Sequence, residues 1–387
     1  MNEPRTPETA EDFGISLVSD DFMFRLQRRI GLARANGLGI VRRAAIWSLF
    51  GWVSIALWAW SMARALSSAV TEPLFAHFGI QLRSLVAIPL FIVAEGLAQG
   101  LTTRRPPHFV RPGLVPPNAP PRFAAAIADT GRLRGASLPW MAIFAIVVAI
   151  ITSTQVTREL HEVSWTVVGE GPVRHIGFSG WWFIYVRRPI FLTLLLAWLW
   201  RGVLLFVLFG RIAKLPLSIV PTHPDRTGGF GFLGRFPAMF APVVLAIGSM
   251  LASGWAHDVV YHGAHVTSLR GEMAAFVAVS PAVFPSPLLV IAPLLSHAKK
   301  PALLQYDTLI GRHGRLVREK WIEGKDVKDV AVLDGTELGP VADAVAMYDA
   351  VLRTRPVPLS KSSVAPLVLA ILVPVIELPK ELLPSLI

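Results

Sequence analysis

The chain has 387 residues, of which 53% are apolar and only 16% are charged, and its mean hydropathy is +0.53. Soluble globular proteins carry about 25% charged residues, so this composition predicts an integral membrane protein. The absence of cysteine excludes disulfides, thiolate metal sites and cysteine catalysis. The formal net charge of +11 fits a membrane protein whose inner loops concentrate Lys and Arg.

Apolar runs long enough to cross a hydrocarbon core of about 30 Å as helices recur along the chain. The six clear runs are 44–66, 80–101, 138–157, 189–210, 236–256 and 274–296. A seventh run, 364–383, is interrupted by three prolines and by Glu377, and we expect it either to cross the membrane or to re-enter it. The expected fold class is therefore all-α, a polytopic helical membrane bundle with six or seven transmembrane helices.

The distribution of basic residues predicts the orientation of this bundle. Most of the 37 Lys and Arg residues fall in the N-terminal tail, in the second and fourth loops, and after the sixth run. By the positive-inside rule these segments, and with them the N-terminus, are expected in the cytoplasm. The loops on the opposite side contain only Arg158, Arg174, Arg187, Arg188 and Arg270.

The chain then divides into a cytoplasmic tail (1–43), a six-span bundle (44–298), a cytoplasmic helical segment (299–362) and a hydrophobic C-terminal segment (363–387). Apolar spacing predicts short helices over 123–133, 303–321 and 341–352. No internal repeat is evident. The positive charge is spread over separate inner segments without interleaved stacking aromatics, so we expect membrane lipid rather than nucleic acid as its partner.

Glu95 in the second run and Arg201 in the fourth are ionisable residues inside apolar segments. Both runs are expected to cross in the same direction, and the two residues lie at similar depths, which predicts an ion pair. Such a pair could belong to an ion or proton pathway, or it could only fix the register of the two helices.

The inner loop 221–234, with the sequence PTHPDRTGGFGFLG, could bind an anion or a lipid phosphate through free backbone N–H groups. It satisfies a G-x-G-x-x-G pattern, but a dinucleotide site would need a preceding strand, and membrane spans flank this loop. A tight turn capped by its own aspartate explains the same residues. The candidate site residues are His223, Asp225, Arg226, Gly228, Gly229 and Gly231.

Three stretches, namely the loop 222–233, the run 83–95 (RSLVAIPLFIVAE) and the segment around Trp321, together resemble an uncharacterised family of bacterial multi-pass inner-membrane proteins. The resemblance implies a location in the bacterial inner membrane. It assigns no catalytic residue and no cofactor, because no activity is established for such a family.

Two further features could carry chemistry. His257, His262 and His265 follow the fifth run, and on a continuing helix they would share one face and could hold a periplasmic metal ion, sense pH, or stand as solvated loop residues. The sixth run contains four prolines within thirteen residues, which predicts a broken helix that either builds a midplane site or is a plain kink.

These observations leave three functions open. Glu95, Arg201 and the broken sixth span favour transport or permeation of a small ion or solute. The inner loop would instead suit a membrane-embedded enzyme or a lipid-binding or anion-binding protein at the inner leaflet, although no Walker A, H-E-x-x-H or G-x-S-x-G motif occurs. The charged cytoplasmic segments would suit a membrane signalling or scaffold subunit. The oligomeric state is not encoded in any of these features.

Overall fold

The computed structural model describes residues 16–19, 21–33, 38–62, 74–104, 109, 113–116, 119–153, 166–168, 175–326 and 339–382. Within this part of the chain nearly all secondary structure is helical, as expected. The exception is an antiparallel pairing of two residues each, β1 (Val167–Val168) with β2 (His175–Ile176), in which Val167 lies opposite Ile176.

Five helices in the described chain are long and apolar enough to cross a membrane, and each overlaps one of the first five expected spans. Their bounds are Ile40–Ser61, Phe78–Thr103, Pro120–Ser153, Phe178–Ala213 and Gly231–Tyr261. A sixth arises if two helices, Arg270–Val283 and Ser286–Ile322, are counted as one span with a bend of 42°. The bend follows the expected proline cluster, because proline removes the backbone donors that would continue the helix. The last segment contributes a shorter apolar helix, Lys361–Ile376.

The first half of the bundle begins with α1 (Phe22–Arg29) and α2 (Ile40–Ser61), and a single 3-10 turn, η2 (Leu74–Ala76), precedes the second span. The third span consists of α6 (Pro120–Gly135) and α7 (Ser137–Ser153), separated by the extended residue Ala136. The expected short helix 123–133 is thus the middle of α6.

The second and fourth spans share one construction that the sequence did not reveal as a repeat. Each has a five-residue helix, a π-helical turn and a long helix: α3 (Phe78–Leu82), η3 (Arg83–Ala87) and α4 (Ile88–Arg104), then α9 (Phe178–Trp182), η6 (Phe183–Arg187) and α10 (Arg188–Ala213). In both π turns a backbone N–H bonds the carbonyl five residues earlier, and a proline, Pro89 or Pro189, comes next. The proline lacks the N–H that would continue a regular ladder, which accounts for the wider turn at the same place in both spans.

The second half of the bundle begins with the 3-10 segment η7 (Gly231–Phe240), which leads into α11 (Ala241–His262). The bent span comprises α12 (Arg270–Val283), η8 (Ser286–Ile291), α13 (Ala292–Val317) and η9 (Arg318–Ile322). After it come α14 (Gly339–Leu352) and α15 (Lys361–Leu382). The expected helices 303–321 and 341–352 correspond to α13 with η9 and to α14.

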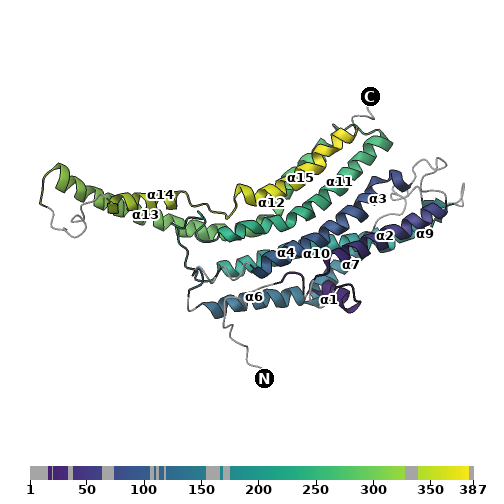
Figure 1. The fold of residues 1–387 in the computed structure, drawn as a ribbon, viewed down its shortest axis with the longest axis horizontal. Helices are drawn as coiled ribbons and strands as arrows, with labels where there is room; N and C mark the ends of the chain where they lie inside the picture. Colours follow the sequence, from purple (N-terminus) through teal and green to yellow (C-terminus); the bar gives the residue numbers. More distant parts are fainter. Residues whose placement is uncertain are drawn as a thin grey trace, which may run out of the picture.

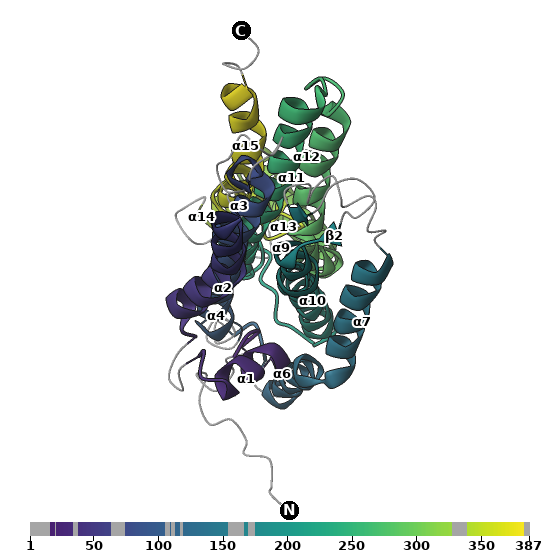
Figure 2. The ribbon, with the colours of Figure 1, turned by 90° about the vertical axis from the view of Figure 1, so that its right-hand side faces the viewer.

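The layout places the two ends of the described chain on opposite edges of the bundle. Figures 1 and 2 show α1 and α6 along one edge and α11, α12 and α15 along the other. The α13 and α14 helices pack side by side and form an arm that stands out beyond the other helices (Figure 1). Gly248 allows α11 to approach its neighbours closely, since a Cβ there would lie 2.8 Å from both Phe276 of α12 and Pro374 of α15.

The N-terminal segment is part of the core. Leu17, Val18 and Phe24 are buried in the same hydrophobic cluster as the second and fourth spans. The Arg25 guanidinium donates to the Gly135 carbonyl at the end of α6 at 3.1 Å. Residues 17–19 and 21–33, which the sequence placed in a cytoplasmic tail, therefore cover one side of the bundle and bring polar side chains with them.

Candidate functional site

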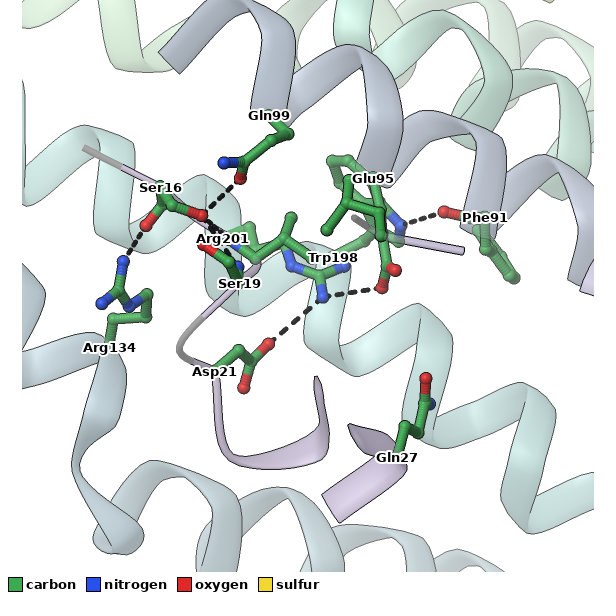
Figure 3. A network of polar contacts seen from close by, with 12 residues as sticks. Ser16, Ser19, Asp21, Gln27, Phe91, Glu95, Gln99, Arg134, Trp198 and Arg201 are labelled. Atoms are coloured by element: carbon green, nitrogen blue, oxygen red, sulfur yellow. Dashed lines mark hydrogen bonds and ion pairs between the residues drawn. The ribbon is translucent and has the colours of Figure 1, made fainter. Parts of the chain in front are cut away.

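The expected ion pair between the second and fourth spans is present. The Nη2 atom of Arg201 in α10 donates to Oε1 of Glu95 in α4 at 2.8 Å, and both side chains are at most 3% exposed. Figure 3 shows the two side chains pointing toward one another between their helices. The predicted contact between these two residues is thus confirmed.

Two further charged residues, which sequence reasoning did not connect to this pair, complete a four-membered network. Asp21 precedes α1, and its Oδ2 accepts from the same Nη2 of Arg201 at 3.2 Å (Figure 3). Arg43, in the first turn of α2, places Nη2 at 2.6 Å from Oε2 of Glu95. Two guanidinium groups and two carboxylates are buried together, so the formal charge of the network is zero.

Aromatic rings and one amide cover the arginines. The Arg201 guanidinium lies 5.0 Å from the ring centroid of Trp198, and the Arg43 guanidinium lies 5.1 Å from that of Phe24. Such cation–π contacts compensate part of the lost hydration. The side-chain oxygen of Gln27 accepts from Nε of Arg43. Trp198 donates its indole N–H to the Phe91 backbone carbonyl at 3.0 Å (Figure 3).

The network is not saturated with hydrogen bonds. Within the described chain, Oδ1 of Asp21 and the Nε and Nη1 atoms of Arg201 are buried without a hydrogen-bond partner. Burial raises the pKa of the Asp21 carboxyl to about 6, because desolvation outweighs the attraction of Arg201 and the Glu95 carboxylate adds repulsion. One member of the network can therefore change its charge near neutral pH.

Ser16 fixes the N-terminal segment beside the network. Its hydroxyl bonds the Gln99 side chain in α4 and accepts from the Ser19 amide at 2.8 Å, and its carbonyl accepts from Arg134 in α6 (Figure 3). The segment is thus held to α4 and α6 just before Asp21. The amphipathic pattern of Phe22–Arg29 gives no signal for this docking, because the buried side chains are Phe24 and Gln27 whereas Phe22 and Leu26 are exposed.

In the glycine-rich loop 221–234, backbone N–H groups bind the carboxylate of the loop's own Asp225. Asp225 accepts from the amides of Thr227 at 2.8 Å, Gly229 at 3.2 Å and Gly231 at 2.8 Å, and Nδ1 of His223 lies 2.8 Å from its Oδ1. Burial alone would raise the pKa of Asp225, but these bonds outweigh it and hold the pKa below its usual value. The N–H groups expected to receive an external anion are therefore occupied within the loop.

The remaining loop residues serve the turn. Gly228 and Gly229 have positive φ angles of 63° and 98°, where glycine is favoured, and Arg226 adopts a φ of 59° despite its side chain. The Arg226 side chain is exposed. The backbone carbonyl of Arg226 accepts from the Arg355 amide at 2.7 Å. The loop is thereby joined to the connection between α14 and α15.

The expected histidine face is not formed, because the helix does not continue. The α11 helix ends at His262, and Gly263 follows with a φ of 64°, so His265 lies beyond it in an exposed turn. The His257 ring stacks on that of His77 at 5.2 Å, and the side chain of His262 lies outside the described part of the structure. Among the residues described, no group of three or more His, Cys, Asp or Glu could hold a metal ion.

The bend in the sixth span forms an apolar cavity of about 290 Å³ against α10. Trp198, Phe206, Phe240, Phe284 and Pro287 are among its lining residues. The Ser286 hydroxyl, the polar group at the bend, bonds the Val283 carbonyl at 2.7 Å. This cavity offers no ionised ligand from the residues that line it, so the charge network is the better candidate for the functional site.

Comparison with known proteins finds no family model, no curated protein and no solved structure that matches this chain.

Proposed function

We propose that this chain is an integral protein of the bacterial inner membrane through which a small ion or solute permeates. The apolar helices support an integral membrane protein. The basic inner segments and the family resemblance support the bacterial inner membrane as its location. The observation that supports permeation is the buried network of Asp21, Arg43, Glu95 and Arg201.

In this placement the α13–α14 arm and the glycine-rich loop lie in the cytoplasm, and α15 is a seventh crossing. The α15 helix packs along α11 and, with 22 residues, is about 33 Å long. The absence of cysteine makes the orientation directly testable. An impermeant maleimide should label His265→Cys only from the periplasmic face and Ile322→Cys only from the cytoplasmic face. Labelling of both from one face would overturn the placement.

The energetic argument for permeation concerns the cost of the network. Burying four charges in an apolar bundle is expensive, and apolar residues of similar size often stabilise a fold equally well or better. Ionisable residues within spans commonly mark ion or proton pathways. Because the unpartnered Nε and Nη1 atoms of Arg201 can donate to a transient acceptor, we assign the pathway to this layer of the bundle.

The N-terminal segment acts as the gate in this scheme. Arg201 has two carboxylate partners, Asp21 on the segment and Glu95 on a span. Because the pKa of the docked Asp21 carboxyl lies above its usual value, deprotonation as the pH rises through about 6 leaves a poorly solvated charge in the bundle and favours release of the segment, whereas protonation favours the docked state. Flux should therefore increase as the pH rises through about 6.

The experiment is flux across liposomes that contain the purified protein, measured between pH 5 and pH 8. Asp21→Asn, which stays uncharged and docked, should carry little flux at any pH, whereas Asp129→Asn should keep the wild-type profile, because Asp129 is partly exposed and pairs with Arg132 outside the network. A wild-type profile without pH dependence, or one unchanged in Asp21→Asn, would overturn the gate. Absence of flux in every protein would overturn permeation itself.

A second function, as a membrane scaffold, is favoured by the arm. Trp321 and Ile322 at the end of η9 are 67% and 77% exposed, next to basic residues of the same helix. A partner that docks there should be lost when Trp321 and Ile322 are both replaced by serine, while the bundle stays intact. An unchanged complex would count against this role. The inner-leaflet enzyme or lipid-binding function gains no comparable support, because Asp225 already fills the loop.

A further inference from the structure

The α1 helix presents three different faces around its axis. At about 100° per residue, Phe24 and Gln27 share the face that is buried against the bundle. Phe22 and Leu26 lie about 130° away from that face, and each is 44% exposed. Ile30, whose amide bonds the Leu26 carbonyl at 3.1 Å, continues this line and is 59% exposed. The docked helix therefore leaves a stripe of three large apolar side chains exposed.

The third face of α1 is basic. Arg25, Arg28 and Arg29 are all exposed, and the helix contains no acidic residue. On the same helical spacing these arginines point about 110–120° away from both the buried face and the apolar stripe. The helix thus contacts the bundle with one face and turns an apolar and a basic face outward. This division is typical of helices that lie in a membrane interface.

The contacts of α1 place it beside the first turns of two spans. The Phe22 ring lies 6.1 Å from that of Trp140 in the first turn of α7, and Gln27 bonds Arg43 in the first turn of α2. Figure 1 shows α1 next to the junction of α6 and α7. In the placement proposed above, both spans begin at their cytoplasmic ends. The helix therefore lies at the inner boundary of the membrane.

The two exposed faces of α1 call for different surroundings. Water would solvate the arginines but would leave the apolar stripe hydrated. The inner boundary of a bilayer supplies hydrocarbon and anionic phosphate side by side. We propose that α1 lies in the inner interface of the membrane, with its apolar stripe among acyl chains and its three arginines on the phosphates of anionic lipids. This inference rests on the proposed membrane placement and does not depend on permeation.

The apolar stripe is tested by its depth in the membrane. Because the chain contains no cysteine, a spin label can be placed at one position of the full-length protein. In nanodiscs of phosphatidylcholine with phosphatidylglycerol, a label on Leu26→Cys should be more accessible to oxygen than to a water-soluble nickel chelate, and a label on Arg29→Cys should show the reverse. Preferential access of nickel to Leu26→Cys would mean that water covers the stripe, and exclusion of both reagents would mean that protein covers it. Either result would overturn the proposal, and Ile30→Cys repeats the measurement if Leu26→Cys does not fold.

The arginines are tested through the same label on Leu26→Cys. Its ratio of oxygen to nickel accessibility should rise as phosphatidylglycerol replaces phosphatidylcholine, because arginines near the surface attract anionic lipid. Adding Arg28→Gln and Arg29→Gln should abolish most of this rise. Arg315→Gln with Arg318→Gln is the matched control, because it removes two exposed arginines from the α13–α14 arm and should leave the rise unchanged.

Two further outcomes separate this proposal from the proposed function. No rise with phosphatidylglycerol, or an equal rise without the two α1 arginines, would overturn the binding of anionic lipid. Failure of the purified chain to enter nanodiscs would overturn the membrane placement on which the proposal rests. Both measurements can be made on a protein that carries no flux.

Discussion

Arg201 and Glu95 lie 106 residues apart in the chain and meet at 2.8 Å between Nη2 and Oε1. Each of the two residues also pairs with a second residue of opposite charge. The same nitrogen of Arg201 reaches Asp21, and the other oxygen of Glu95 reaches Arg43. The pair therefore joins α4 and α10 to the first span and to the N-terminal segment, and a change at one residue should affect all four.

The costs of removing the two members of the pair should not add. Arg201→Met or Glu95→Gln leaves an uncompensated buried charge, so each should lower the free energy of unfolding by about 3–5 kcal/mol. The double variant should lose less than the sum of the two. Unfolding in detergent measures this, with Arg132→Met as the control. Arg132 pairs with Asp129 at the surface, and its loss should cost less than about 1 kcal/mol. Strict additivity would contradict the coupling.

The Asp21 carboxyl should make stability depend on pH in a defined direction. Its pKa of about 6 in the folded protein lies above the usual 3.8, so between these pH values the folded state binds more protons than the unfolded chain. The free energy of unfolding should therefore fall by up to about 1.4 kcal/mol per pH unit as the pH rises from about 4 to about 6. Unfolding curves of Asp21→Asn should lack this component, and identical slopes in both proteins would contradict the assignment.

Gly234 should control how the connection before α15 docks on the inner loop. A Cβ there would lie 2.6 Å from the Pro358 carbonyl and 3.0 Å from the Ser363 hydroxyl. Gly234→Ala should therefore displace this connection, lower stability by about 1–3 kcal/mol, and speed amide exchange at Arg355, whose N–H bonds the Arg226 carbonyl. Gly254→Ala, which has open space around it in α11, is the control and should be neutral or slightly stabilising. Equal effects of the two substitutions would refute this packing role.

The sequence was sufficient for the apolar spans and for the pair inside them, because hydropathy and helical rise act locally. It was insufficient for Asp21 and Arg43. A polar segment before the first span looks like a solvated tail, and only tertiary packing shows that Leu17 and Phe24 are buried and bring Asp21 into the core.

For the glycine-rich loop the structure selects one of the two alternatives that the sequence left open, and for the histidines it removes the expected helical face. The pattern around Asp225 predicts free N–H groups and a capped turn equally well, and the side-chain rotamer decides between them. The histidine face required α11 to continue past His262, but Gly263 ends the helix in a left-handed conformation. The paired π turns were hidden because only their prolines and a few aromatics match between the two spans.

Flux across liposomes by the wild type and by the Arg201→Met/Glu95→Gln double variant is the most direct test of the proposed permeation. The double variant removes one positive and one negative charge together, so the formal charge of the network stays zero, and monodisperse elution with unchanged helical content would show that a loss of flux does not reflect misassembly. We expect wild-type flux of at least one small ion, increasing above about pH 6, and none from the folded double variant. Equal flux in the two proteins, or none from the wild type across several ions and a pH gradient, would contradict a pathway through this network.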